Sequence, residues 1–477
     1  MPSRPLILRG PALFRERELR LIEQTAMRIL EEVGIEISHP DLGARARRHG
    51  FQFHSAHVRL PRQQVSAFIE ETRQGRRRHR PHRVPPATEP ASLSLSISSY
   101  PQHVHDPDTD QVVPFTSERL IEATKLVAML SDRGLSPAAP GCPVDVPPLL
   151  QPLLQYRIAV ENLHGAPGPV DAKHIESLPY IMEMADAVGH PIRSLPIYVF
   201  SPLRLGGESL SAAMEFESRL QGVFVSSMPS AGCTAPVRPA EAFALAAAEV
   251  IGSALILCDC LSIEVGWAIS LYPFDLRGMA MSFGSPESLL FQAASSEINA
   301  YFHGEDWWPA VGNIHTLAKQ PGPQAAAEKM SIMLAGALWG GRYFDSAGSL
   351  SLDELFSPVQ LLLDIEIKDH VERLIAGLDT GVDSDACLSD VRDGIEQGFL
   401  GLERTVDHYQ ALCWHPRLFE RCFLGPWQAA GCPPLERQAR QMIRELIAQH
   451  DYQPQAETAA ALEGIYRRAE RELAGAR

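Results

Sequence analysis

Two pairs of polar residues lie at the ends of predicted β-strands in the second half of the chain, where they could do chemistry. Asn313 and His315 follow one strand, and Asp345 and Ser346 close the next. In a barrel the carboxyl ends of parallel strands share one rim, so all four residues are predicted to converge over a pocket. A histidine there would bind a substrate carboxylate or relay a proton; an ordinary loop histidine is the alternative.

A carboxylate, Glu264, lies inside another predicted strand, residues 262–266. Side chains alternate between the two faces of a strand, so Glu264 shares a face with Ser262 and Gly266 and not with its apolar neighbours. If this small polar face points inward, Glu264 is a buried carboxylate that pairs with a substrate cation. A structural ion pair with an arginine is the alternative.

The elements that must position these residues are short β-rich runs alternating with helical runs between residues 91 and 380. This alternation indicates βα units, and the length matches the ~250 residues of a (β/α)8 barrel. No Gly-x-Gly-x-x-Gly turn or Walker phosphate loop favours an open sheet. The eight predicted strands are residues 92–98, 135–139, 163–166, 195–200, 222–227, 262–266, 309–313 and 342–346. We predict an α/β fold, a (β/α)8 TIM barrel with N-terminal and C-terminal helical extensions.

Helical periodicity and composition suggest three regions. Apolar residues at helical spacing predict helices over residues 17–33, 239–257, 285–301, 324–338, 435–447 and 457–473. The stretch 72–90 is rich in arginine and proline, which is typical of a linker; contact with an acidic partner is the alternative. We predict an N-terminal helical region with its linker at 1–90, a barrel catalytic domain at 91–380 and a C-terminal helical extension at 381–477.

Charge and hydropathy restrict the partners. With 43 basic and 58 acidic side chains the formal charge is −15, so nucleic acid is not an expected partner. The first ten residues do not resemble a signal peptide, and Glu241, Glu249, Asp259 and Glu264 interrupt the most apolar region. We predict a cytoplasmic protein that does not enter a membrane.

The chain has eight cysteines, and none of them forms a Cys-x-x-Cys pair. Cys258 and Cys260 flank Asp259, but two thiolates do not complete a zinc site. We interpret each cysteine as a reduced, small core residue, with no metal site.

Several segments resemble the trimethylamine:corrinoid methyltransferase family. Ser230-Ala-Gly-Cys-Thr-Ala-Pro-Val237 is similar to the family's small-residue turn before an alanine-rich helix. Phe274-Asp-Leu-Arg277 and Phe283-Gly-Ser-Pro-Glu287 resemble its loop after the sixth strand. Further similar segments are residues 29–35, 58–61, 357–366, 405–409 and 414–421, so the likeness covers most of the chain.

The chain also departs from the family pattern. Ile97-Ser-Ser-Tyr-Pro-Gln102 stands where the family usually has a glycine-rich turn, and residues 312–319 replace a Ser-Asp-Ala-Lys-like segment. No pyrrolysine is present in the printed sequence. These changes lie in the predicted pocket, so the resemblance implies the reaction class more strongly than the substrate.

The resemblance implies a TIM barrel that passes a methyl group from a substrate nitrogen to Co(I) of a corrinoid, a cobalamin-type cofactor. A separate corrinoid protein carries that cofactor, this chain binds none tightly, and a homo-oligomer is expected. A quaternary ammonium is already activated as a leaving group, whereas a tertiary amine needs a device such as pyrrolysine. The resemblance therefore implies a small quaternary amine, betaine-like, as the substrate.

A quaternary cation is well held by aromatic faces and a carboxylate. Under this resemblance the catalytic candidates are Glu264, His315 and Asn313, and the substrate-binding candidates are Trp267, Tyr272, Phe274, Phe283, Arg204, Asp345 and Ser346. The aromatic residues would form a cage, with loop packing as the alternative, and Arg204 would bind a betaine carboxylate. We expect Glu264, Trp267 and His315 to surround one cavity open to solvent.

Two rival hypotheses stay open. One is a zinc-dependent barrel methyltransferase that uses a thiol substrate. The other is a non-catalytic family relic that binds a methylated amine, which the altered loops after the first and seventh predicted strands suggest.

Overall fold

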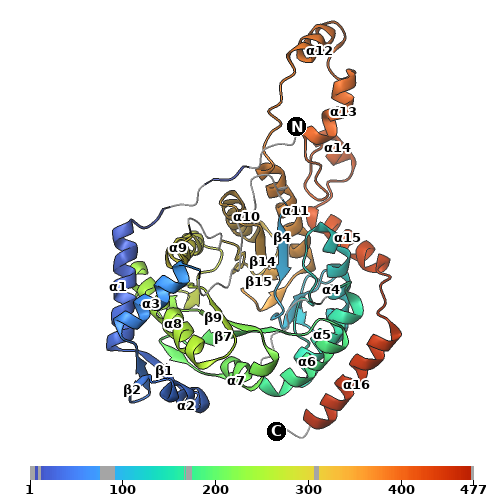
Figure 1. The fold of residues 1–477 in the computed structure, drawn as a ribbon. Helices are drawn as coiled ribbons and strands as arrows, with labels where there is room; N and C mark the ends of the chain where they lie inside the picture. Colours follow the sequence, from blue (N-terminus) through green and yellow to red (C-terminus); the bar gives the residue numbers. More distant parts are fainter. Residues whose placement is uncertain are drawn as a thin grey trace.

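The computed structural model describes residues 6–8, 12–75, 92–165, 167, 174–305 and 311–473. It confirms a mixed α/β fold in which helices surround short strands (Figure 1). One group of helices, coloured orange in Figure 1, projects from this body.

Three strands form the first parallel sheet. They are β7 (Ser194–Val199), β9 (Gly222–Ser227) and β11 (Glu264–Trp267), in the order β11-β9-β7. The first residues of the three strands lie side by side, so the strands start level with one another. The sequence analysis predicted all three, and β9 has the predicted bounds.

The second parallel sheet joins β4 (Ser94–Ile97) to β14 (Tyr343–Ala347), which lie far apart in the sequence. Single parallel bridges extend it by one residue on each side: Leu135 pairs with β4, and Asn313 pairs with β14. The first and last predicted barrel strands are therefore neighbours, as a closed barrel requires.

Two predicted strands are much reduced, and one is absent. Residues 135–139 and 311–313 contribute one bridge each, and residues 309–310 lie outside the described residues. Residues 163–165 form a bend where α5 (Gln151–Asn162) ends, and Ala166 is not described. The backbone N–H of Leu163 caps that helix by bonding to Ala159 and so cannot join a ladder. Among the described residues, hydrogen-bonded ladders therefore form two arcs and not a closed ring of eight strands.

Helices follow the strands along the chain, and most of them begin with proline at the first or second position. Proline fits there because its missing N–H would have no partner in the helix. These helices are α4 (Ser117–Met129), α5, α6 (Leu178–Ala187), α7 (Glu208–Glu215), α8 (Pro239–Cys260), α9 (Pro286–His303), α10 (Pro323–Leu338) and α11 (Pro358–Ile375). The helices predicted at 239–257, 285–301 and 324–338 are all present.

Helix α8 is the most buried helix of the body. It is long and apolar enough to cross a membrane by composition, contrary to the sequence analysis, but 89% of its most apolar window is buried inside the protein. Its acidic Glu249 is buried too, and it accepts hydrogen bonds from the Ser201 hydroxyl (2.9 Å) and the Leu203 N–H (3.1 Å). The apolar composition of α8 is thus explained by core packing.

Short strands in the loops after the main strands build two small sheets. One has the order β15-β16-β5-β6 and the other the order β10-β12-β13. Their bounds are β5 (His103–His105), β6 (Val112–Pro114), β10 (Ser230–Ala231), β12 (Tyr272–Asp275), β13 (Ala280–Met281), β15 (Ser349–Leu350) and β16 (Leu355–Phe356). Each follows the carboxyl end of a main strand, which is the end where barrel enzymes bind substrate.

The N-terminal region docks on the side of the body. It contains α1 (Glu16–Glu32), β1 (Ile35–Ile37), α2 (Pro40–Arg48), β2 (Gln52–His54), β3 (His57–Arg59) and α3 (Arg62–Arg73). Helix α1 buries Ile22, Ala26 and Leu30 in the core cluster shared with α8, and β1 pairs with β8 (Arg204–Leu205). Most of the predicted linker, residues 76–90, lies outside the described residues.

The C-terminal region has two parts. Helices α15 (Leu435–Gln449) and α16 (Ala456–Leu473) pack on the body, α15 against α4 and α11, and α16 against α5 and α6. Between them and α11, the helices α12 (Ser384–Gln397), α13 (Glu403–Leu412) and α14 (Leu424–Ala429) form the projecting group, which we call the arm (Figure 1).

Candidate active site

A cavity of about 460 Å³ lies between the two parallel arcs. It is lined by Ser96 and Ile97 of β4, by Ser98 directly after that strand, and by Tyr343 and Asp345 of β14. Leu95 of β4 is buried in a hydrophobic cluster instead. Across the cavity lie Ser194, Pro196 and Tyr198 of β7. This volume is in the range of small-molecule sites, ~300 to 1,000 Å³.

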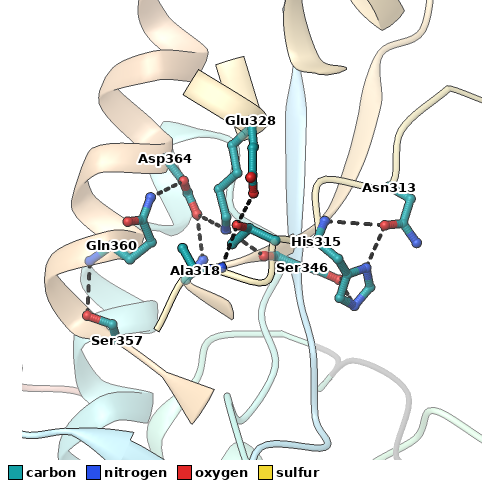
Figure 2. Close-up of polar contacts among 11 residues, drawn as sticks. Asn313, His315, Ala318, Glu328, Ser346, Ser357, Gln360 and Asp364 are labelled. Atoms are coloured by element: carbon teal, nitrogen blue, oxygen red, sulfur yellow. Dashed lines mark hydrogen bonds and ion pairs between the residues drawn. The ribbon is translucent and has the colours of Figure 1, made fainter. Parts of the chain in front are cut away.

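His315 is held in place at the cavity by three polar neighbours, of which Figure 2 shows Asn313 and Ser346. Its Nδ1 lies 2.6 Å from Asn313 Oδ1, and its Nε2 lies 2.9 Å from Asp353 Oδ1 and 2.8 Å from the Ser346 hydroxyl. Both ring nitrogens thus face oxygen atoms, and these contacts fix the orientation of the ring. The structure brings Asn313, His315 and Ser346 together, as the sequence analysis predicted.

Two aspartates differ in their environment at this cavity. Burial raises the pKa of Asp345, and the Asp353 carboxylate adds to this effect, although His315 opposes it. Oδ1 of Asp345 is buried and has no hydrogen-bond partner in the described part of the chain. Burial also acts against the charged form of Asp353, but the hydrogen bond and charge of His315 outweigh it and lower the pKa of Asp353. Asp353 therefore pairs with the histidine, whereas Asp345 bonds to the Ile314 backbone and to Ser346 and keeps one oxygen, Oδ1, without a partner among the described residues.

A backbone irregularity aims Ser346 at His315. Ser346 has φ 66°, in the left-handed region that residues other than glycine seldom adopt, and the β14–β4 register shifts at this point. The buried Lys329 supports this conformation, since its Nζ donates to the Ser346 carbonyl (3.1 Å) and to Asp364 Oδ2 (2.6 Å). Asp364 also accepts from the Gly348 N–H at 2.7 Å and from Gln360 at 2.8 Å (Figure 2).

The loop that carries His315 is tied to helix α10. The Thr316 hydroxyl bonds to Glu328 and accepts from the Ala318 N–H at 3.0 Å (Figure 2). Lys319 donates to the Ser351 hydroxyl at 2.7 Å, and this links the loops after the seventh and eighth predicted strands. The loops are therefore fixed relative to each other without substrate.

Part of the predicted aromatic cage lies behind His315. The Phe283 ring centroid is 5.3 Å from that of His315 and 5.4 Å from that of Tyr272. Burial raises the pKa of Tyr272 to about 12, and the charge of Asp345 contributes. Phe274 pairs with Met281 between β12 and β13, in the loop beyond Tyr272. None of the three aromatic residues lines the cavity directly, and Phe283 reaches the site through the ring of His315.

Trp267, Glu264 and Arg204 are not at the cavity, so the prediction that Glu264 and Trp267 surround it with His315 is wrong. Strand β11 extends through Trp267, and alternation places Trp267 on the face opposite to Glu264. There Trp267 lies between Phe68 of α3, with ring centroids 6.4 Å apart, and His303 of α9, at 4.2 Å.

Glu264 is the first residue of β11 and is exposed, at the end of the sheet away from the carboxyl ends of the strands. The strand starts two residues later than predicted, which moves this carboxylate out of the interior. Arg204 belongs to β8 and bonds to Glu36 at 3.2 Å, with 58% of its side chain exposed. This ion pair links β8 to β1 of the N-terminal region.

Sequence reasoning missed Asp353 and Lys329. Lys329 gave a signal, because it occupies an apolar position of α10, one turn from Ala325 and Ile332, and lysine is almost never buried without a partner. Asp353 gave none, since it reaches His315 only because β15 and β16 fold back over β14.

All eight cysteines are free, as predicted, but the prediction that each one is a core residue is wrong. Cys142 and Cys260 are buried, but Cys233, Cys387, Cys413, Cys422 and Cys432 are exposed. Most of the exposed ones belong to the arm region, which has little core to bury them. In the part of the chain that the structure describes, no group of three or more His, Cys, Asp or Glu side chains could hold a metal ion.

Known proteins resemble this chain over most of its length. The family model described as Trimethylamine methyltransferase (MTTB) matches residues 7–473. Trimethylamine methyltransferase MttB of Methanosarcina barkeri strain Fusaro is 30% identical over 268 residues, 55% of this chain and 53% of the relative. The chain therefore spans about half the length of such curated relatives.

Two further proteins match more of the chain. Glycine betaine methyltransferase of Desulfitobacterium hafniense strain Y51 is 23% identical over 453 residues, 87% of this chain and 88% of the relative. The crystal structure of the Methanosarcina barkeri monomethylamine methyltransferase MtmB aligns over 98% of this chain and 88% of its own, with 12% identity and a TM-score of 0.47. Because the family model covers nearly the whole sequence, this chain belongs to the trimethylamine methyltransferase family.

Proposed function

We propose that this chain is a methyltransferase that takes a methyl group from a small quaternary amine and delivers it to the corrinoid of a partner protein. Membership of the family supports the reaction class, because the relatives are named as trimethylamine and glycine betaine methyltransferases. The observation that carries the proposal is the cavity in which Asp345, with a buried carboxylate oxygen that has no partner, lies beside the fixed His315.

The two parallel arcs fit a (β/α)8 barrel with weakened strands between them. In the described residues, five strands and two single bridges occupy seven of the eight predicted strand positions, and β4, at the first position, pairs with β14, at the last. The small sheets after β4, β9, β11 and β14 would then form the rim of this barrel. Such a barrel would enclose the cavity, and this supports the proposal.

The corrinoid, when its carrier protein presents it, supplies a nucleophilic cobalt. A cavity of about 460 Å³ suits a small amine and is too small to hold the corrinoid as well, so the cofactor stays with the partner. The chain's own task is then to bind the amine and to hold one methyl group in line with the cobalt.

Residues of the cavity suit this task. A quaternary ammonium has no N–H to donate, so it is held by charge and by aromatic faces. Asp345 would supply the charge, and Tyr198 and Tyr343, which line the cavity, would supply faces. His315, fixed by Asn313 and Asp353, would shape the wall beside the cation, with Phe283 behind it.

Turnover with reduced cobalamin tests the proposal. The purified chain is incubated with chemically reduced cobalamin and tetramethylammonium, choline, trimethylamine or glycine betaine, while the Co(I) absorbance and the demethylated amine are followed. We expect at least one quaternary amine to be demethylated. We expect His315→Ala to lower kcat/KM by about 10²-fold, the order caused by misplaced reacting groups. The exposed His49→Ala is the matched control.

Absence of turnover with every amine would overturn the methyltransferase proposal. Calorimetric binding of an amine without turnover would instead support the hypothesis of a non-catalytic relic. Size-exclusion chromatography of the same samples tests the expected homo-oligomer.

A further inference from the structure

We infer that the amine taken by this cavity is a quaternary ammonium with a neutral, hydroxyl-bearing arm and no carboxylate. This inference rests on the proposed function and names its substrate class. It also departs from the betaine-like substrate that the sequence suggested.

The charge of the cavity wall argues against a carboxylate. Of the described residues that line the cavity, Asp345 and Asp353 are acidic, and no lysine or arginine lines it. A betaine carboxylate would therefore meet two aspartates without a lysine or arginine to balance them, and burial strengthens that repulsion.

The lysine and arginine side chains near the site are already engaged, and His190, which also lines the cavity, is an exposed residue. Lys329 is completely buried and bonds to Asp364 at 2.6 Å, on the far side of the Ser346 backbone. Lys319 is directed to the Ser351 hydroxyl at 2.7 Å. Arg204, which the sequence suggested as a carboxylate partner, bonds to Glu36 away from the cavity.

His315 does not replace them. Its Nδ1 is occupied by Asn313 at 2.6 Å, and its Nε2 faces both Asp353 and Ser346 within 2.9 Å. A substrate carboxylate would have to displace a carboxylate that is already bound to the ring.

The rest of the wall offers neutral hydroxyl groups. The cavity is larger than a tetramethylammonium ion needs, so a longer arm fits beside the cation. Hydroxyl side chains along it come from both arcs, from α5 and from α7, among them Ser96, Ser136, Ser194, Ser209, Tyr156 and Tyr343. Burial raises the pKa of Tyr343, which keeps its hydroxyl neutral and able to donate. Such groups hydrogen-bond an alcohol on both its donor and acceptor sides.

Choline and glycine betaine form a matched pair for the test, because they differ only in an alcohol against a carboxylate on the same trimethylammonium group. Binding is measured by calorimetry on the chain alone, and turnover is measured with reduced cobalamin. We expect choline to bind at least 10-fold more tightly than glycine betaine and to be demethylated with at least 10-fold higher kcat/KM. Tetramethylammonium should bind more weakly than choline.

The outcomes separate this inference from the proposed function. Equal or better use of glycine betaine would overturn the inference and leave the methyltransferase proposal standing. If choline is demethylated no better than tetramethylammonium, the inference of a hydroxyl-bearing arm is overturned. Choline binding without demethylation of any amine would support the inferred ligand and overturn the proposed activity.

Two variants assign the preference to residues. Asp345→Asn should weaken choline binding and reduce the choline-to-betaine ratio by at least 10-fold, whereas the exposed Asp132→Asn should leave both unchanged. Ser96→Ala provides a second variant, because it should lower affinity for choline and leave affinity for tetramethylammonium unchanged. An unchanged ratio in Asp345→Asn would overturn its assignment as the discriminating group.

Discussion

The body and the arm differ in burial: the body buries its apolar side chains, whereas the helices of the arm expose theirs. In helix α8 nearly every apolar side chain is buried, whereas α13 and α14 bury none of their residues and α12 buries only Gly394. Phe243 of α8 is fully buried, and Phe423 beside α14 is 87% exposed. Apolar composition alone therefore does not say which helix belongs to the core.

The difference shows where the stability of this protein resides. The body contains a fully buried ion pair and an apolar core on each side of the cavity, while the arm's helices carry their apolar residues on the surface. Removing a group should therefore cost much in the body and little in the arm. Each of the following predictions tests that contrast.

The largest effect is expected at Lys329. Lys329→Ala should lower the free energy of unfolding by about 3 to 5 kcal/mol, because it leaves Asp364 buried without its cation. Urea unfolding at neutral pH measures this loss. Arg17→Ala, whose side chain is 74% exposed, is the control, and a loss below about 1 kcal/mol at Lys329 would show that the pair is not the support we describe.

Truncation of the core of the body should come next. Phe243→Ala removes a fully buried ring that contacts Phe14 and Phe291, so we expect a loss of about 3 kcal/mol. The same urea titration measures it, and an unchanged midpoint would contradict the assignment of α8 as the core helix.

His303 should make the body sensitive to acid. Burial lowers the pKa of His303 to about 4 from its ordinary value of 6.5, so the folded protein binds a proton there less readily than the unfolded chain. Its contribution to stability is present above pH 6.5 and is lost as the pH falls toward 4. Between pH 7 and pH 5 we expect a loss of about 2 kcal/mol. In His303→Gln that part of the pH dependence should disappear; if the two titrations coincide, another group is responsible.

Asp345→Asn should stabilise the protein while it weakens cation binding. The pKa of Asp345 is raised, so the folded protein holds this proton more tightly than the unfolded chain does. The resulting stabilisation is present at low pH and is lost as the pH rises from the ordinary pKa of 3.8 through the pKa of the folded state. At pH 7 the asparagine should therefore gain about 1 kcal/mol, and the gain should shrink near pH 4. Thermal unfolding at both pH values checks this, and destabilisation at pH 7 would contradict it.

The smallest effect is expected in the arm. Phe423→Ala should change the free energy of unfolding by less than about 0.5 kcal/mol, because the ring is already exposed. It is the matched comparison for Phe243→Ala, because each substitution removes one phenyl ring. A loss above about 1 kcal/mol would remove the contrast between the two regions.

Local patterns in the sequence determined the elements and part of the site. Helical periodicity and prolines at first turns located α8, α9 and α10, and β-rich runs located β7, β9 and β14. Asn313, His315, Asp345 and Ser346 could be grouped in advance because they end strands that lie side by side, and the bridge between Asn313 and Asp345 shows that they do.

Only the tertiary structure decided which side chains reach the cavity. Side chains alternate along β11, so Trp267 points toward α3, on the face opposite to Glu264. Because β11 starts two residues later than predicted, Glu264 lies at the exposed start of the strand. Asp353 and Lys329 reach the site through a hairpin and a helix that follow the strands. Such contacts depend on packing between distant segments, which local periodicity does not encode.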